Sequence, residues 1–407
     1  MSGYWVFGGK YSHAFSHSQG SMRTSTVLVL LCLLGCVSCF FYPSRPEGTG
    51  WRLIQTSEKH AEWVQGDVLE NLMFGMDIDT AVSPKLWIAV RLYRRFKDVT
   101  SHWEEGSRIS VERKKGTIPD YPTPNPTAHP EVSDLFKLAN ADSLESIVKE
   151  MTSLQTRYYK SKESRQASEF VRGKVEEILK KAGTTDVTVE YIDNTGYDQP
   201  NVIVKIPAKE GSSTSSEISI VGAHIDSICS EDCSGGKEAR APGADDDASG
   251  SATVLEIFRL IVEGKWRGKR QIHFMWFAAE EPGLLGSATV AKQYKKQKAN
   301  QLTTSGYHSE GNSMTTLTDP NSKFANYLYK IAQAYVPEVP IIKDSCGYAC
   351  SDQWSFDDEG FPAGMYIESE PTDPYVHSIQ DTYNRLDFDG MVHFVKVGVA
   401  WLTEVSR

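Results

Sequence analysis

The chain has 407 residues, a formal net charge of −10, 40% hydrophobic residues and 11% aromatic residues. This length and composition suffice for one large globular domain with a smaller unit beside it. The acidic balance is not offset by a basic run with interleaved aromatic residues, which argues against a nucleic-acid partner. The sequence shows no sign of an internal repeat.

The N-terminal region has the pattern of a secretory signal. Arg23 precedes the apolar run Val27–Cys36, and small residues follow up to Cys39. We expect cleavage near Cys39. The apolar run is too short to span a bilayer comfortably, which argues against a membrane anchor. Residues 1–39 are thus a leader and signal, and the processed protein is predicted to be secreted and free of the membrane. The signal-like unit starts at Met22, so translation is expected to begin there.

Residues 40–131 differ in composition from the rest of the chain. They contain amphipathic pieces such as Ala61–Met73 and Lys85–Phe96, and they end in the proline-rich stretch Ile118–Pro130. Such a stretch is typical of an extended, accessible linker. We interpret the segment as a propeptide that is removed near the linker and is a partner of the main domain until then. An ordinary N-terminal accessory domain is the alternative.

The cysteines outside the signal form two close pairs. They are Cys229 with Cys233 and Cys346 with Cys350. An even number of cysteines in a secreted chain predicts two local disulfides. A zinc knuckle is the alternative, but its usual C-x2-C spacing differs from the spacing here.

Residues 132–407 alternate between helical and strand patterns. The capping pattern of Asp142 and Glu145 precedes an apolar helical stripe, and several strands follow it. Strands that alternate with helices predict an α/β domain of three layers, with a mixed, mainly parallel central sheet and helices on both faces. The expected helices are Ser164–Ala182, Ala288–Lys298 and Asp389–Val405, and the expected strands are Val187–Ile192, Val202–Ile206, Ile218–Ala223 and Gln271–Ala279.

Polar residues gather where the strand Ile218–Ala223 ends. His224 and Asp226 follow this strand, and a Gly/Pro/Ser loop leads to the three adjacent aspartates of residues 245–247. Asp226 points the same way as His224 along an extended chain, so it could orient the imidazole of a metal ligand. The aspartates precede an apolar helical pattern, so their simplest interpretation is a helix cap.

Two glutamates shift the balance from a cap to a metal site. Gln271–Ala279 is a near-continuous apolar run, which is typical of a strand buried on both faces, and Glu280 and Glu281 end it. In α/β sheets, functional groups collect at the carboxyl ends of strands. The sequence therefore predicts a metal site at this edge. His377 lies in a later polar loop, with Asp381 close enough to orient it.

From about residue 140 onward, the arrangement resembles the secreted zinc-dependent leucyl aminopeptidases of the bacterial and fungal type. Residues near Arg52 and Met76 resemble the propeptide of this family more weakly. The motifs that carry the resemblance are G-x-H-x-D at Gly222–Asp226, APGADDDASG at Ala241–Gly250, AAEEPGLLGS at Ala278–Ser287, CGYACSD at Cys346–Asp352 and H-S-x-Q-D-T at His377–Thr382.

The resemblance implies a pair of zinc ions that share one carboxylate. Matched motif by motif, Asp246 resembles the bridging ligand and His224 a ligand of one zinc. Glu281 and His377 resemble the ligands of the other zinc. Peptides with a free N-terminus are the implied substrates.

Three further residues match functional positions of the family. Glu280 resembles the general base, Tyr348 the hydroxyl that supports the developing oxyanion, and Asp226 the partner that orients the histidine ligand. The pair Cys346 and Cys350 matches a disulfide of the family. Glu280 would accept the proton of water and pass it to the leaving amine.

The sequence departs from the family pattern at one metal ligand. Where the family has a strand that ends in a metal-binding aspartate, this chain reads QLTTSGY, so Thr303 stands at the aspartate position and the apolar strand before it looks lost. The zinc on Glu281, His377 and Asp246 would keep three ligands. The zinc on His224 would keep two, which bind weakly. An error in the gene sequence or a divergent enzyme would each account for this.

We expect a secreted metallo-aminopeptidase that removes apolar, leucine-like N-terminal residues and acts as a monomer. A single-zinc enzyme on the same fold, resembling glutaminyl cyclases, is one alternative. A non-catalytic secreted relative that has lost a metal site is another. Retention of Glu280, which has little structural reason to persist in an inactive protein, argues against the second alternative.

Overall fold

The central feature is a sheet of eight strands in the order β10-β9-β11-β8-β6-β7-β5-β4. The computed structural model describes residues 43–76, 82–92, 95–100, 120–230, 233–297, 301–305, 313–369 and 373–406. The predicted leader and signal therefore lie outside the described residues. The strands are β4 (Thr188–Ile192), β5 (Asn201–Ile206), β6 (Ile218–His224), β7 (Gln271–Phe277), β8 (Gln301–Ser305), β9 (Met314–Leu317), β10 (Ile341–Asp344) and β11 (Met365–Glu368).

The middle of the sheet is parallel. Strands β7, β6, β8 and β11 run parallel to one another, as do β9 and β10. Strands β5 and β4 at one edge pair antiparallel, and β9 pairs antiparallel with β11. The mixed sheet predicted from the alternating pattern is confirmed.

Alternate residues of the central strands enter two different hydrophobic cores. On β7, Phe274 and Trp276 belong to the larger core, whereas Met275 and Phe277 belong to the smaller one. Strand β5 divides in the same way, with Ile203 facing the smaller core. A strand buried on both faces needs apolar residues at every position, and this explains the unbroken apolar run in its sequence.

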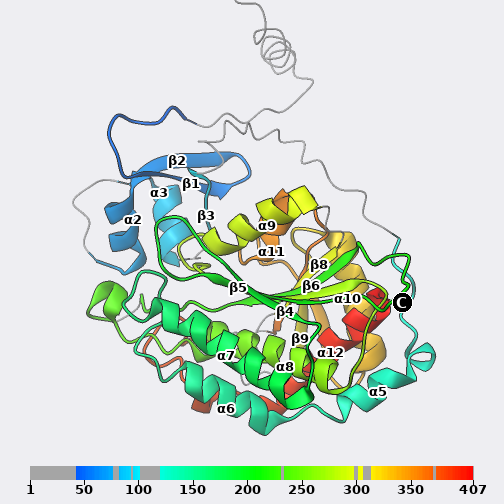
Figure 1. Ribbon diagram of the computed structural model, residues 1–407. Helices are drawn as coiled ribbons and strands as arrows, with labels where there is room; N and C mark the ends of the chain where they lie inside the picture. The colour runs from blue at the N-terminus through cyan, green and yellow to red at the C-terminus, as the bar shows by residue number, and fades with distance from the viewer. Residues whose placement is uncertain are drawn as a thin grey trace, which may run out of the picture. The chain divides into compact units, whose positions relative to one another are not determined.

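Helices cover both faces of the sheet (Figure 1). The larger core is lined by α6, α7, α8, α10 and α12, and the smaller one by α9 and α11, which gives the predicted three layers. The helices are α5 (Pro130–Phe136), α6 (Ala141–Met151), α7 (Ser164–Ala182), α8 (Gly250–Glu263), α9 (Leu285–Gln297), α10 (Ser322–Tyr335), α11 (Gln353–Asp358) and α12 (Phe388–Val405). Short helical turns are η2 (Pro126–Ala128), η3 (Gly236–Glu238), η4 (Ala244–Ser249) and η5 (Tyr383–Arg385).

The predicted capping residue of α6 is wrong by two positions. Asn140 is the N-cap, and its Oδ1 accepts hydrogen bonds from the backbone N–H groups of Asp142 and Ser143. Glu145 instead pairs with Lys149 one turn later. Asparagine caps a helix as well as aspartate does, so the pattern alone does not fix which residue takes the position.

The N-terminal segment forms a small sheet with its own helices. Strand β1 (Trp51–Ser57) pairs with β2 (His60–Gln65) and β3 (Lys97–Asp98). The predicted amphipathic piece Ala61–Met73 is wrong as a single element, because β2 ends at Gln65 and helix α2 starts at the next residue. The helices here are α2 (Gly66–Met73), α3 (Pro84–Trp87) and the π-helical turn η1 (Ile88–Leu92).

This N-terminal segment packs against the main domain. Its residues Ile54, Phe74 and Phe96 share a hydrophobic core with Tyr158 and Ala279 of the main domain. Ion pairs join Lys160 with Glu70 and Lys97 with Asp358. Its removal as a propeptide stays a prediction.

The strand that the sequence suggested was lost is present. Strand β8 holds five residues, Gln301–Ser305, and it lies between β6 and β11 in the sheet. Thr303 pairs with Val221, which is three residues before His224 on β6. The expectation of a missing strand is therefore wrong, and the sheet is continuous across this position.

Among the described residues, no helix combines the length and apolar character that crossing a membrane requires.

The pH dependence of stability tests the buried histidine of β7. Burial, and secondarily Lys205, lower the pKa of His273 from 6.5 to about 3. Its unfolded state therefore binds a proton that the folded state does not, so stability is lost as the pH falls from 6.5 toward 3. As the pH is lowered, we expect the unfolding free energy of His273→Gln to fall less steeply than that of the unmodified chain. The difference in slope should reach up to about 1.4 kcal/mol per pH unit.

Urea unfolding at several pH values measures this slope. The control is His60→Gln at a half-buried histidine of β2. An unchanged slope in His273→Gln would contradict the assignment.

Candidate metal centre

The carboxylate of Asp246 lies between two histidines. Its Oδ1 is 2.9 Å from Nε2 of His224, and its Oδ2 is 2.7 Å from Nε2 of His377. Nε2 of His377 is also 3.3 Å from Oε2 of Glu281. The four metal ligands predicted from the sequence are thus brought together, although they come from four separate segments.

The strand ends account for this convergence. His224 is the last residue of β6, and it pairs with Phe277, the last residue of β7. The chain leaves β7 toward Glu280 and Glu281, so the histidine and the glutamates emerge at the same edge of two parallel strands. Ala279 and His377 both have left-handed backbone conformations, with φ of 53° and 60°. Such conformations are uncommon for residues other than glycine and cluster at functional sites.

Asp226 holds the two glutamates in place. Its side chain is fully buried, and its carboxylate accepts hydrogen bonds from the backbone N–H of Glu280 at 2.9 Å and of Glu281 at 3.1 Å. Its Oδ1 also lies 3.4 Å from Nδ1 of His224. At this distance Nδ1 of His224 makes no hydrogen bond to Asp226, so the predicted role beside His224 stays a prediction. What the carboxylate fixes is the turn after β7.

The aspartate cluster has both a capping and a site function. Asp247 Oδ1 accepts from the N–H of Gly250, the first residue of α8, as the helix-cap interpretation expects. Its Oδ2 accepts from the N–H of His224 at 3.1 Å. Only the middle aspartate, Asp246, faces the two histidines.

Two buried residues support the loop that carries Asp246. The carboxylate of Asp381 accepts from the backbone N–H groups of Asp245 and Asp246, at 2.7 Å and 3.2 Å. The guanidinium of Arg157, which is fully buried, donates to the carbonyls of Ile225 and Gly243. Sequence inspection missed Arg157, because its partners are backbone carbonyls that leave no pattern in the sequence.

The charges in the site perturb one another strongly. Burial alone would lower the pKa of His377, but the carboxylates of Glu281 and Asp246 raise it to about 10. Burial opposes ionisation of Asp246, yet the hydrogen bonds from His224 and His377 hold its pKa below the ordinary value. Burial raises the pKa of Glu280 well above its ordinary value, partly offset by His224.

Tyr348 lies on the loop between β10 and α11. Its ring is 5.0 Å from the ring of Trp354, and Leu284, four residues after Glu280, packs in the same small cluster. Nζ of Lys97, from the N-terminal segment, lies 4.8 Å from the centre of the Tyr348 ring. Sequence inspection gave no signal for Lys97.

Both predicted disulfides are confirmed. Cys229 pairs with Cys233 and Cys346 pairs with Cys350, each with a Cα–Cα distance of 6.0 Å. The zinc-knuckle alternative therefore fails for these four residues. The second disulfide closes the loop that carries Tyr348.

The donor set fits a zinc ion. One ligand atom each from Asp246, Glu281 and His377 lies within 4.8 Å of the others. Oε1 of Glu281 is buried and accepts no hydrogen bond from the described residues. Two carboxylates and an imidazole are ligands that zinc prefers, and three protein ligands leave a position open.

Comparison with known proteins agrees with the fold. The sequence profile of peptidase family M28 matches residues 201–402. A probable leucine aminopeptidase of Trichophyton verrucosum is 37% identical over 288 residues, which cover 68% of this chain and 76% of the relative. Leucine aminopeptidase 1 of Neurospora crassa is 31% identical over 385 residues, covering 89% of this chain and 88% of the relative.

A solved structure shares the fold. The LapA aminopeptidase of Legionella pneumophila superposes with a TM-score of 0.72, covers 88% of this chain and 94% of its own, and is 24% identical. The chain belongs to peptidase family M28, the family of zinc-dependent aminopeptidases that its motifs resemble. Its general activity is that of a peptidase of the aminopeptidase type.

Zinc affinity tests the role of Asp226. In Asp226→Asn, one of the two backbone N–H groups would face an amide NH2 group instead of an oxygen, and the histidine would lose a charged partner. We expect zinc to bind about 10–100-fold more weakly, as for other partners of metal ligands. Competition with a chromogenic chelator measures the affinity. Asp193→Asn, at an exposed aspartate, is the control, and equal affinity in the two variants would refute the role.

Proposed function

We propose that this chain is a secreted zinc aminopeptidase that removes apolar, leucine-like residues from the N-termini of peptides. The observation that carries the proposal is the placement of Asp246, whose two carboxylate oxygens face two different histidines. A carboxylate so placed suits a bridge between two metal positions. The M28 membership and the leucine aminopeptidase relatives support the choice of substrate.

The two metal positions are unequal. Asp246, Glu281 and His377 would hold one zinc with three protein ligands. Of the four ligands matched to the family, His224 and Asp246 would remain for a second zinc, because threonine stands at position 303. When bound, zinc would supply Lewis acidity to the attacking water and to the scissile carbonyl.

The protein side chains would manage the proton and the developing charge. Glu280 lies beside a metal ligand, and the hydrogen bond from its own N–H to Asp226 fixes its backbone. In this position it would take a proton from the attacking water and return it to the leaving amine. Tyr348 would donate a hydrogen bond to the oxyanion that forms at the carbonyl.

Several features support secretion. The signal-like N-terminus and two disulfides suit an oxidising compartment. The N-terminal segment, interpreted as a propeptide, would stay on the domain until its linker is cut. We propose that the processed enzyme acts as a monomer on peptide substrates, without a nucleic-acid or membrane partner.

Two other functions make different predictions. A single-zinc enzyme like the glutaminyl cyclases would cyclise an N-terminal glutamine and release no amino acid from a leucine amide. A non-catalytic relative would bind peptides without turnover, even with zinc supplied. The facing histidines around Asp246 favour the aminopeptidase.

Zinc content tests the unequal positions. After dialysis, we expect about one zinc per chain by elemental analysis, because three ligands bind firmly and two bind weakly. His377→Ala should lose this zinc, whereas His224→Ala, at a histidine that faces the other oxygen of Asp246, should keep it. Two firmly held zinc ions in the unmodified protein would mean that a further residue completes the second position. Equal zinc content in the two variants would contradict the assignment.

Turnover tests the role of Glu280. We expect Glu280→Gln to reduce kcat for a leucine chromogenic amide by about 10²–10⁴-fold, because proton transfer fails while zinc binding persists. The measurement pairs steady-state kinetics with zinc content on the same sample. Glu145→Gln on α6 is the control, since its ion pair with Lys149 is at the surface. Activity of Glu280→Gln equal to that of the unmodified chain would exclude this residue as the base.

A further inference from the structure

The loop that carries Tyr348 is fixed at its start as well as closed on itself. Residues 347–349 lie between the two cysteines of a disulfide, Cys346 and Cys350, in the segment that follows strand β10. The residues on either side of Tyr348 both have left-handed backbones, with φ of 82° at Gly347 and 52° at Ala349. A disulfide sets the shape of such a loop, but it does not set the direction of the loop relative to the sheet. A separate attachment is needed for that.

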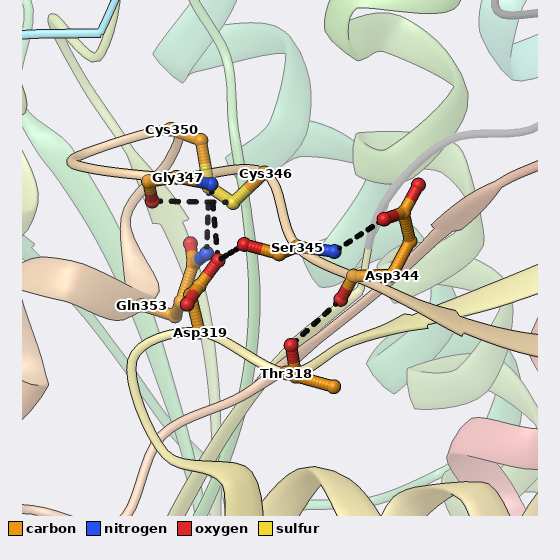
Figure 2. The surroundings of a disulfide bond; sticks show 8 residues. All are labelled: Thr318, Asp319, Asp344, Ser345, Cys346, Gly347, Cys350 and Gln353. Carbon is orange, nitrogen blue, oxygen red and sulfur yellow. Dashed lines mark hydrogen bonds between the residues drawn. A yellow bond between two sulfur atoms is a disulfide. The ribbon is translucent and has the colours of Figure 1, made fainter.

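Asp319 supplies this attachment (Figure 2). Its Oδ2 accepts a hydrogen bond from the backbone N–H of Gly347 at 3.0 Å and from Oγ of Ser345 at 2.5 Å. One carboxylate oxygen therefore binds the chain on both sides of Cys346. Hydrogen bonds to an ionised acceptor are about twice as strong as neutral ones.

The sheet holds Asp319 itself in position. Asp319 follows β9, which pairs in parallel with β10 and matches Leu317 to Asp344. Beyond this last pair, the backbone N–H and Oγ1 of Thr318 both donate to the carbonyl of Asp344, at 2.7 Å and 2.9 Å. The carboxyl ends of two neighbouring strands are thus joined before the loop begins.

The far side of the loop is held more weakly. Nε2 of Gln353 donates to Sγ of Cys350 at 3.3 Å, and sulfur is a weak acceptor. The ring of Tyr348 packs against Trp354, and the ammonium of Lys97 lies over both rings, 4.8 Å and 5.5 Å from their centres. These contacts restrain the ring, whereas the carboxylate of Asp319 joins the backbone of the loop to the end of β9.

We propose that Asp319 is a positioning residue that directs Tyr348 toward the reacting carbonyl. This inference rests on the proposed role of Tyr348 in the aminopeptidase reaction. Asp319 itself touches no metal ligand and no substrate. Its effect on catalysis passes through the loop, so it disappears when the hydroxyl of Tyr348 is absent.

The experiment is a double-mutant cycle in the full-length protein. Removal of one oxyanion donor costs about 10²–10³-fold in kcat, so Tyr348→Phe sets the scale. We expect Asp319→Ala to lower kcat by at least about tenfold, within the loss set by Tyr348→Phe, and to leave KM nearly unchanged. The reason is that the hydroxyl of Tyr348 would be misplaced while the substrate pocket is kept. Asp319→Asn keeps an oxygen acceptor and should restore most of the rate. Asp319→Ala combined with Tyr348→Phe should be no slower than Tyr348→Phe alone.

A matched control lies one residue away. Thr318→Val removes a hydroxyl that binds the end of β10 but touches neither Ser345 nor Gly347, so its kcat should match that of the unmodified chain. If Asp319→Ala lowers kcat by the same factor with and without the Tyr348 hydroxyl, the role of Asp319 is merely structural and the inference fails. The inference also fails if Asp319→Ala keeps full kcat.

Hydrogen exchange separates this inference from the proposed function. If the unmodified chain shows no turnover, the proposed aminopeptidase function fails, and exchange of the peptide 345–350 still tests the attachment. Faster exchange in Asp319→Ala than in Asp319→Asn supports it, and equal exchange overturns it.

Discussion

The site depends on the burial of one carboxylate, Asp226. A buried charge is costly unless its oxygens are satisfied, and here the N–H groups of Glu280 and Glu281 satisfy them. These bonds tie Asp226, two residues after the end of β6, to the turn after β7, so the ends of the two strands cannot separate without exposing an unpaired charge. Glu280 and Glu281, the base and the metal ligand that we propose, are therefore held close to the end of the strand that carries His224.

Buried polar residues extend the same principle outward. Arg157 donates to backbone carbonyls on both sides of the site, and Asp381 accepts from the amides of Asp245 and Asp246. The turn η4 before α8 departs from helical geometry at Asp246 and Asp247, and the side chain of Asp381, from a distant segment, satisfies the backbone N–H groups of Asp245 and Asp246. Asp246 can thus present its two carboxylate oxygens to His224 and His377, because its backbone N–H is already bound by Asp381. The loop that carries Asp246, the proposed bridging ligand, is held in this way without being part of the sheet.

The chain contributes to the site from segments at both ends of its sequence. Lys97 comes from the N-terminal sheet and lies over the ring of Tyr348, while its ammonium pairs with Asp358 of α11. Asp319 holds the start of the Tyr348 loop to β9. The proposed zinc ligands and the proposed oxyanion donor are therefore supported by different parts of the fold. Loss of one support would change metal binding, and loss of the other would change the rate.

The sequence by itself determined the α/β fold, the principal strands and helices and both disulfides, because buried strands have continuous apolar runs and cysteines close in sequence can pair locally. The convergence of groups at the carboxyl ends of parallel strands indicated a metal site at this edge, and the motifs shared with a known family singled out Asp246 and His377 within it. The tertiary structure alone decided the roles of Arg157, Asp319 and Lys97, and it showed that β8 is retained beside β6. These side chains bind backbone atoms or rings from distant segments. Every residue has a backbone, so such contacts leave no pattern that a sequence could reveal.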